Sequence, residues 1–132
     1  MARILVVEDD PDIRALVVRR LEHSGHAVKS APGAVEALES ITDKQPPDVV
    51  VLDINMPDLD GFELLQRLRQ STGNSQLNAI FLSGRMKPDD IAAGRALGAV
   101  YLTKPFVGTS LIGAIDKLLA AEAERVAPKQ DW

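Results

Sequence analysis

Charged and hydroxyl side chains follow four of the short aliphatic runs in this sequence of 132 residues. They are Glu8, Asp9 and Asp10 after the first run, Asp53 at the end of the third, Ser83 with Gly84 after the fourth, and Lys104 after the fifth. Carboxylates that lie together repel one another, so a cation or protons must neutralise some of them. A lysine near a carboxylate and a metal clamps phosphoryl groups, and a serine hydroxyl adds a donor. An aspartate can itself be the nucleophile that forms an acyl phosphate.

The composition limits which metal such a cluster can hold. There is no cysteine, and the two histidines are His23 and His26. Thiolate sites and three-histidine sites are therefore excluded, and oxygen ligands favour Mg²⁺, Mn²⁺ or Ca²⁺. Mg²⁺ fits best, because it takes one or two carboxylates, several waters and a phosphate oxygen. The histidines flank a glycine turn, and we expect them to be solvated.

Length and charge describe a single soluble domain. Apolar residues make up 45% of the chain, charged residues make up 26%, and the net charge is −4. An acidic chain without a basic face is not expected to bind nucleic acid. The longest aliphatic runs have four residues, so no transmembrane helix is expected. The amino terminus does not have the pattern of a signal peptide, and we expect a cytoplasmic protein.

Five short β-branched runs alternate with segments of helical period. The runs predict strands at Arg3–Val7, 27–30, 48–53, 79–83 and Val100–Thr103. Asp10 before Pro11 predicts a helix N-cap, and Gly25 predicts the end of that helix. Its predicted inner face is Ile13, Leu16, Val17 and Leu21. Further helices are predicted over 33–41, from Phe62, over 88–97 and from Leu111.

This order predicts an α/β domain of five βα units. Parallel strands with intervening helices imply right-handed crossovers and an open sheet covered on both faces. In such a sheet the ligand site lies at the carboxyl ends of the strands, where Glu8, Asp9, Asp53, Ser83 and Lys104 are found. The tail from about Ala120 is Ala/Glu-rich and then polar, which is typical of a helix end or a linker.

Four motifs, in order, resemble the receiver domain of bacterial response regulators. They are ILVVEDDP at 4–11, VLDINMP at 51–57 with DG at 60–61, FLS at 81–83, and YLTKPF at 101–106. The resemblance implies a flavodoxin-like doubly wound domain over residues 1–121, with strand order 2-1-3-4-5 and five helices, followed by a tail at 122–132. One residue is missing relative to the family between Gly98-Ala99 and Tyr101, so we expect a shortened turn next to the output face.

The resemblance also implies a role for each matching residue. Asp53 is both the phosphoacceptor and a metal ligand. Asp9 binds Mg²⁺ directly, Glu8 acts on the metal through water, and the backbone carbonyl of Asn55 completes the metal site. Ser83, Gly84 and Lys104 contact the phosphoryl group. Ser83 and Tyr101 form the switch pair, and Pro105 follows a cis peptide bond.

The implied function is a signalling switch rather than an enzyme, with only self-phosphorylation and autodephosphorylation chemistry. The donor is a histidine kinase or a histidine phosphotransfer protein, and Mg²⁺, or Mn²⁺ in its place, is the cofactor. A downstream protein binds the face built from the fourth helix, fifth strand and fifth helix. A homodimer that depends on phosphorylation is a further expectation.

Two other functions share part of this pattern. A Mg²⁺-dependent phosphohydrolase or a topoisomerase-primase-like nuclease also places acidic residues after its strands. These proteins need a second metal-binding carboxylate two residues after Asp53, where this chain has the amide of Asn55. A receiver used only for docking would lack a site residue, and all of them are present. A Rossmann dehydrogenase is excluded, because no Gly-x-Gly-x-x-Gly follows the first strand.

Overall fold

Strands and helices alternate along the chain. The computed structural model describes residues 2–41, 46–54, 56, 59–84, 87–103 and 108–126. Its elements are β1 (Arg3–Val7), α1 (Pro11–His23), β2 (Ala27–Ala31), α2 (Ala34–Ser40), β3 (Val49–Asp53), α3 (Gly61–Thr72), β4 (Asn78–Ser83), α4 (Pro88–Ala96), β5 (Val100–Thr103) and α5 (Gly108–Val126). The predicted sequence of five βα units is confirmed.

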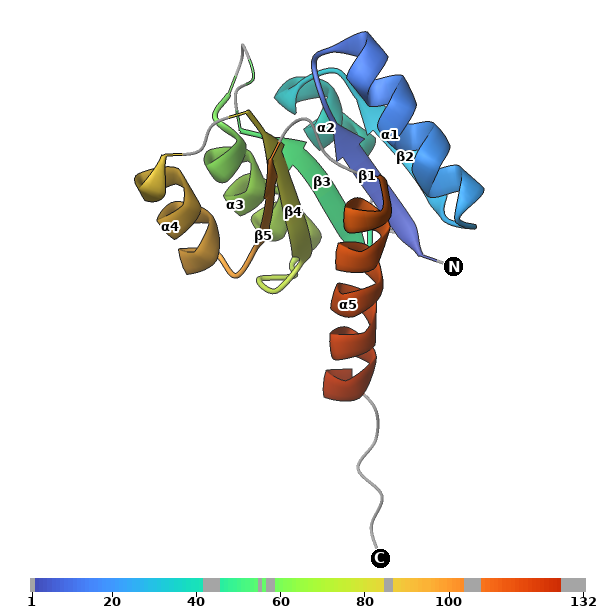
Figure 1. Cartoon of the computed structure of the whole chain (residues 1–132). Helices are drawn as coiled ribbons and strands as arrows, with labels where there is room; N and C mark the ends of the chain where they lie inside the picture. The colour runs from blue at the N-terminus through green and yellow to red at the C-terminus, as the bar shows by residue number, and fades with distance from the viewer. Residues whose placement is uncertain are drawn as a thin grey trace, which may run out of the picture.

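The strands form one parallel sheet with the order β2-β1-β3-β4-β5 (Figure 1). This is the order that the family resemblance implies. All five carboxyl ends reach the same edge of the sheet, and β1 and β3 are neighbours there. The order reverses between these two strands, because β2 lies outside β1 while β3 continues on its other side. Ligand sites of open α/β sheets lie at such a switch point.

Alternation along the central strands divides the core into two layers. In β3, Val50 and Leu52 face one layer, and Val49 and Val51 face the other. The first layer is closed by buried residues of α2 and α3, namely Ala34, Ala37, Leu64, Leu65 and Leu68. The second is closed by α1 and α5, through Val17, Leu21, Leu111 and Ile115. A strand buried on both faces must be apolar throughout, which explains the continuous run before Asp53.

Helix α1 begins and ends as its sequence predicts, but one side chain of its expected inner face is outside. The Asp10 carboxylate accepts hydrogen bonds from the backbone N–H of Asp12 (2.9 Å) and Ile13 (3.2 Å). Gly25, just past the helix end, has a φ of 92°. Leu16 is 53% exposed, so the prediction that it packs inward is wrong. Val17 and Leu21 are spaced by four residues and fill the buried stripe, which leaves Leu16 at its edge.

The boundaries of α2 are also narrower than predicted. The sequence predicts a helix over 33–41, whereas the structure has Ala34–Ser40. Gly33 and Ile41 both have extended backbone and act as the two caps. The strands β1 and β5 have the predicted bounds, whereas β2, β3, β4 and the fourth helix each differ from the prediction by one residue at one end. In the described part of the chain, no helix has the length and apolar character needed to cross a bilayer.

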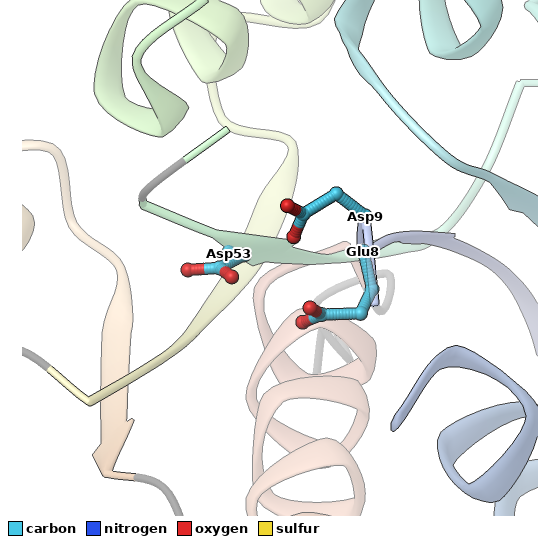
Figure 2. A group of neighbouring side chains, drawn as sticks. All are labelled: Glu8, Asp9 and Asp53. Carbon is cyan, nitrogen blue, oxygen red and sulfur yellow. The ribbon is translucent and has the colours of Figure 1, made fainter. Parts of the chain in front are cut away.

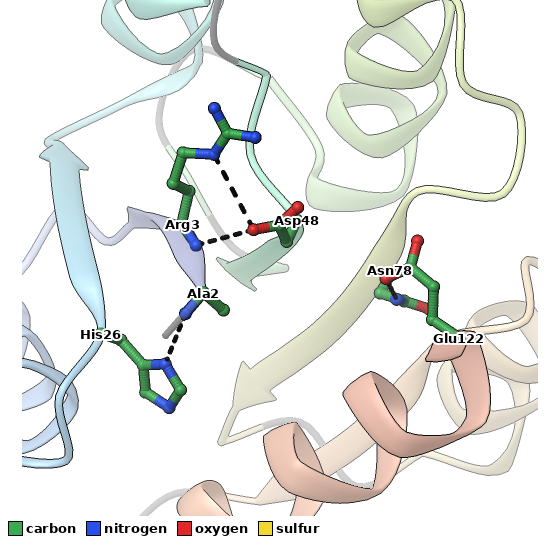
Figure 3. Close-up of polar contacts among 6 residues, drawn as sticks. All are labelled: Ala2, Arg3, His26, Asp48, Asn78 and Glu122. Carbon is green, nitrogen blue, oxygen red and sulfur yellow. Dashed lines mark hydrogen bonds and ion pairs between the residues drawn. The ribbon is translucent and has the colours of Figure 1, made fainter. Parts of the chain in front are cut away.

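Polar contacts tie together the amino-terminal edge of the sheet (Figure 3). Asp48 accepts a hydrogen bond from the backbone N–H of Arg3 (2.8 Å), and the Nδ1 atom of His26 accepts one from Ala2 N–H (3.1 Å). Asn78 donates to Glu122 of α5 at 3.2 Å. These contacts join segments 24 to 45 residues apart. His26 therefore has a structural contact that the sequence analysis did not expect.

Arg69 joins the ends of three elements near the start of β4. Its guanidinium donates to the carbonyl oxygen of Leu77 from Nη2 (2.9 Å) and to that of Leu97 from Nη1 (2.7 Å). Burial lowers the pKa of the Arg69 guanidinium below its usual value. The carbonyl partners satisfy its donors, so the end of α4 is held against α3 and β4.

Candidate functional site

Three carboxylates from two neighbouring strands meet at the carboxyl edge of the sheet. One oxygen each from Glu8, Asp9 and Asp53 lies within 4.8 Å of the others. Figure 2 shows Glu8 and Asp9 extending from the end of β1 toward Asp53 at the end of β3. The register pairs Val7 with Leu52, so the residues that follow these two must emerge side by side. The predicted clustering of these residues is confirmed.

Burial separates the three acids into two kinds. Glu8 is 2% exposed and Asp53 is 6% exposed, whereas Asp9 is exposed to solvent. Gathering negative charge at a buried edge is costly, and a divalent cation with hard oxygen preferences offsets that cost. The three donors that the described residues bring together are carboxylate oxygens, which suits Mg²⁺ or Mn²⁺. The exposed Asp9 leaves the cluster open to water and to a bound ion.

Hydrogen bonds with nearby residues hold the backbone around Glu8 in place. Its N–H donates to the carbonyl of Ala31 (3.1 Å), and its own carbonyl accepts from Nη1 of Arg14 (2.9 Å). A Glu8 carboxylate oxygen accepts from the N–H of Asp10 (3.3 Å). Asp10 turns its own carboxylate to the start of α1. Asp10 therefore caps α1, as the sequence predicts, whereas Asp9 lies in the carboxylate cluster.

Ser83 and Gly84 lie on the next strand along the same edge. Ser83 is fully buried as the last residue of β4, and Gly84 directly after it is exposed. The residue before Ser83, Leu82, pairs with Asp53 of β3. Strand β4, the neighbour of β3, therefore places Ser83 at the same edge of the sheet as the carboxylate cluster.

Tyr101 lies one strand further out, in β5, where it pairs with Phe81. Its ring is partly buried in the core layer that also contains α3. A methyl group on Gly94 of α4 would lie 3.6 Å from Cδ2 of Tyr101 and 3.6 Å from Cδ2 of Phe81. The ring therefore packs beneath α4, despite the shortened turn before it. Phe81 in turn meets Phe62 edge to face, with ring centroids 4.9 Å apart.

Three predicted site residues, Asn55, Lys104 and Pro105, lie outside the described residues. Gly61 joins the site instead. Its N–H donates to the carbonyl of Ile54, the residue after Asp53, at 3.0 Å. In the sequence, Gly61 stands out only as part of the Asp-Gly pair at 60–61. The position of this pair immediately before an amphipathic helix is the feature that could have indicated its role.

Comparison with known proteins places this site in a family. Residues 4–116 match the family model described as the response regulator receiver domain. The chain belongs to this family. Family membership favours the signalling function over the phosphohydrolase and nuclease alternatives, and phosphoryl acceptance is the standard function of receiver domains.

The relatives of this receiver domain include long and short proteins. The transcriptional regulatory protein PrrA of Mycobacterium tuberculosis is 43% identical over 118 residues, which cover 89% of this chain and 49% of PrrA. An uncharacterized 14.6 kDa protein of Leptolyngbya boryana is 40% identical over 89% of this chain and 90% of its own length. The chain spans about half the length of the first curated relatives that it matches.

A solved structure agrees with the fold. The chemotaxis protein CheY4 of Vibrio cholerae is 31% identical and superposes with a TM-score of 0.81, covering 89% of this chain and 98% of that one. The receiver fold and its five-stranded parallel sheet, which the sequence predicts, are therefore confirmed.

Proposed function

We propose that Asp53 accepts a phosphoryl group from a phosphohistidine of a partner protein, in a reaction that requires Mg²⁺ or Mn²⁺. The observation that carries this proposal is the carboxylate cluster of Glu8, Asp9 and Asp53 at the switch point of the sheet. An aspartate nucleophile beside two further acids needs a cation before it can approach a phosphoryl group. Membership of the receiver family supports the same chemistry.

In the proposed step, a carboxylate oxygen of Asp53 attacks phosphorus in line with the N–P bond of the donor. The new O–P bond makes an acyl phosphate, and the electron pair of the broken bond stays on the imidazole nitrogen. Glu8, Asp9, Asp53 and the backbone carbonyl of Asn55 would hold the metal. When bound, the metal neutralises charge on the phosphoryl oxygens. Asp9 binds it directly, and Glu8 acts through water.

Ser83, Gly84 and Lys104 are the proposed contacts of the phosphoryl oxygens. Support for Ser83 comes from its place at the end of β4, beside the strand that carries Asp53. A buried hydroxyl can donate to a new phosphoryl oxygen without first being stripped of water. Its movement toward that oxygen is the proposed start of a switch that continues to Tyr101.

The proposed output is a change in partner binding rather than turnover of an external substrate. A shallow groove between β5 and α5 supports this, since it is lined by Val100, Leu102, Ser110, Ala114, Lys117 and Leu118. A downstream protein, or a second copy in a phosphorylation-dependent dimer, binds at α4, β5 and α5. Residues 1–121 are the proposed receiver unit, with 122–132 as helix end and tail, in a cytoplasmic protein.

The test is incubation with acetyl phosphate, with and without Mg²⁺, followed by intact-mass measurement. The wild-type chain should gain one phosphoryl group only when the metal is present. Asp53→Asn should gain none, because an amide is not a usable nucleophile. Asp60→Asn is the matched control, since Asp60 caps α3 and asparagine caps equally well.

Labelling of Asp53→Asn at the wild-type rate would show that another residue is the acceptor. No labelling of the wild-type chain by either acetyl phosphate or a phosphohistidine donor would instead favour the docking-only function. A metal-independent gain would contradict the role of the carboxylate cluster.

A further inference from the structure

The first residue of α3 lies directly against the end of the strand that carries Asp53. A Cβ atom on Gly61 would stand 2.4 Å from the carbonyl oxygen of Asp53, 2.8 Å from Cα of Ile54 and 3.1 Å from the carbonyl carbon of Asp53. Contacts below 3.0 Å essentially never occur for real Cβ atoms. The backbone of α3 can approach β3 this closely only because residue 61 has no side chain.

The obstructing atoms are backbone atoms, so no rotamer change can relieve the contact. Two glycines in other helices are less confined. A Cβ on Gly113 of α5 would meet nothing within 4 Å, and one on Gly94 would meet ring carbons at 3.6 Å. A side chain at 61 would therefore have to push the Asp53–Ile54 peptide by about an ångström to reach an ordinary contact of 3.4 Å.

A hydrogen bond fixes the same two segments to each other. Gly61 N–H donates to the Ile54 carbonyl at 3.0 Å and closes the loop between β3 and α3. The helix itself cannot easily give way, because Leu64, Leu65 and Leu68 are fully buried in the core layer. Gly61 thus acts as a rigid support behind the backbone of Asp53.

We propose that Gly61 is a positioning residue for the phosphoacceptor, and this inference rests on the function proposed above. Direct backbone contact with Gly61 fixes the end of β3, and so fixes where the Asp53 carboxylate lies relative to Glu8 and Asp9. The three acids can share one cation because one oxygen of each lies within 4.8 Å of the others, so a shift of the end of β3 would disturb this arrangement. A displacement of about one ångström at a reacting group can lower a rate by about 100-fold.

The test compares Gly61→Ala with Gly113→Ala, which makes the same change in a helix where space is free. Mn²⁺ affinity is measured from the electron paramagnetic resonance signal of the free ion, a readout that needs no phosphoryl transfer. The rate with acetyl phosphate is followed by mass at saturating Mg²⁺ and several donor concentrations, and stability is measured by urea unfolding. Wild type and Asp53→Asn are run in parallel.

Gly61→Ala should lose about tenfold or more in Mn²⁺ affinity and in the maximal labelling rate, as expected for a displaced nucleophile. Gly113→Ala should stay within about twofold of wild type, as expected where the added methyl meets no atom. A second variant avoids any failure to fold. Replacing the Gly61 amide by an ester in a chain assembled by ligation removes the N–H donor to Ile54 and adds no clashing atom. It should weaken Mn²⁺ binding and slow labelling by a few fold.

The possible results separate a failure of the proposed function from a failure of the positioning role of Gly61. If the wild-type chain is not labelled, the proposed function fails independently of Gly61. If the wild-type chain is labelled and a folded Gly61→Ala matches it in Mn²⁺ affinity and rate, the positioning role is refuted. If Gly61→Ala does not fold, the ester variant decides, and wild-type behaviour of that variant overturns the inference.

Discussion

Three consecutive acidic residues in this domain have three different environments. Glu8 is buried, Asp9 is exposed within the carboxylate cluster, and Asp10 caps α1. The difference follows from where the strand stops and the helix begins. Asp10 precedes Pro11 and needs extended backbone to cap, whereas the two residues before it still lie beside the carboxyl end of β3.

The first prediction separates metal binding from capping. Asp9→Asn should weaken Mg²⁺ or Mn²⁺ binding by about tenfold or more, because it removes a charged ligand from a cluster of three. Asp10→Asn should change the affinity less than about threefold, because its carboxylate faces the α1 backbone. Isothermal titration with each ion measures both. If Asp10→Asn weakened metal binding more than Asp9→Asn, the direct metal ligand would be Asp10 rather than Asp9.

The second prediction concerns the cap alone. Asp10→Ala should lower the free energy of unfolding by about 1 kcal/mol, because the N–H groups of Asp12 and Ile13 lose their acceptor. Asp10→Asn is the control and should keep most of the stability. Urea unfolding followed by circular dichroism measures the difference. Equal stability of the alanine variant and wild type would show that the cap contributes nothing.

For single residues, the sequence could predict which side chains lie at the ends of strands, but it could not predict contacts that depend on how the elements pack. The cluster of Glu8, Asp9 and Asp53 could be predicted, because each acid stands at the carboxyl end of a parallel strand. The close approach of Gly61 could not, since the distance between two backbones depends on how α3 docks. His26 was likewise expected to be solvated, and its bond to Ala2 spans 24 residues.

Among the elements, α4 is built with little intrinsic stability. Its N-cap, Lys87, makes no side-chain capping bond, and Gly94 lies in its interior. Its other end is held, because the carbonyl of Leu97 accepts a hydrogen bond from Arg69. Helix α4 is therefore anchored near its carboxyl-terminal end by Arg69 and has a poor helix former in its interior.

The third prediction tests the weak point of α4. Gly94→Ala should raise the free energy of unfolding by about 0.5–1 kcal/mol, because alanine favours helix over glycine and a methyl at 3.6 Å makes ordinary contacts. Gly113→Ala reports the helix propensity alone, since its methyl would meet nothing within 4 Å. Urea midpoints of the two variants are compared. A loss of stability in Gly94→Ala alone would mean that the rings beneath α4 cannot accommodate the methyl.

Element types could be predicted from the sequence more fully than their inner faces. Alternating β-branched runs and turn residues gave all ten elements in order. The face of α1 was misassigned at Leu16, because periodicity alone does not say how wide the buried stripe is. The ends of α2 were placed a residue too far on each side, where Gly33 and Ile41 adopt extended cap conformations.

For the molecule as a whole, the two edges of the sheet are built differently. The amino-terminal edge is tied by contacts of Asp48, His26 and Glu122 with neighbouring segments (Figure 3). The carboxyl edge instead gathers three acids whose like charges a cation would offset. Phosphorylation of Asp53 would act at this edge, and its effect would have to travel sideways through the strands.

The proposed path to the output face crosses β4 and β5. Ser83 ends β4 and is paired with Thr103 of β5, two residues beyond the pair of Phe81 and Tyr101. A movement of Ser83 toward a phosphoryl oxygen on Asp53 would leave space at the end of β4. The ring of Tyr101, already packed beneath Gly94, can fill such space by a change of rotamer, and two ring positions that bury different surface make a bistable element.

The last prediction is that this path is used. Saturation with beryllofluoride and Mg²⁺, which together mimic a phosphoryl group on Asp53, should shift amide resonances near Asp53 and also those of Tyr101 and α4. Tyr101→Ala should keep the labelling rate with acetyl phosphate within about twofold, because its ring lies in the core layer under α4 and not in the carboxylate cluster. In that variant the shifts should stop at β4, and a partner or dimer should no longer respond to phosphorylation.

Shifts confined to the surroundings of Asp53 in the wild-type chain would refute the switch while leaving the phosphoryl chemistry intact. Shifts that still reach α4 in Tyr101→Ala would show that the signal takes another route, through the α4 backbone rather than the ring.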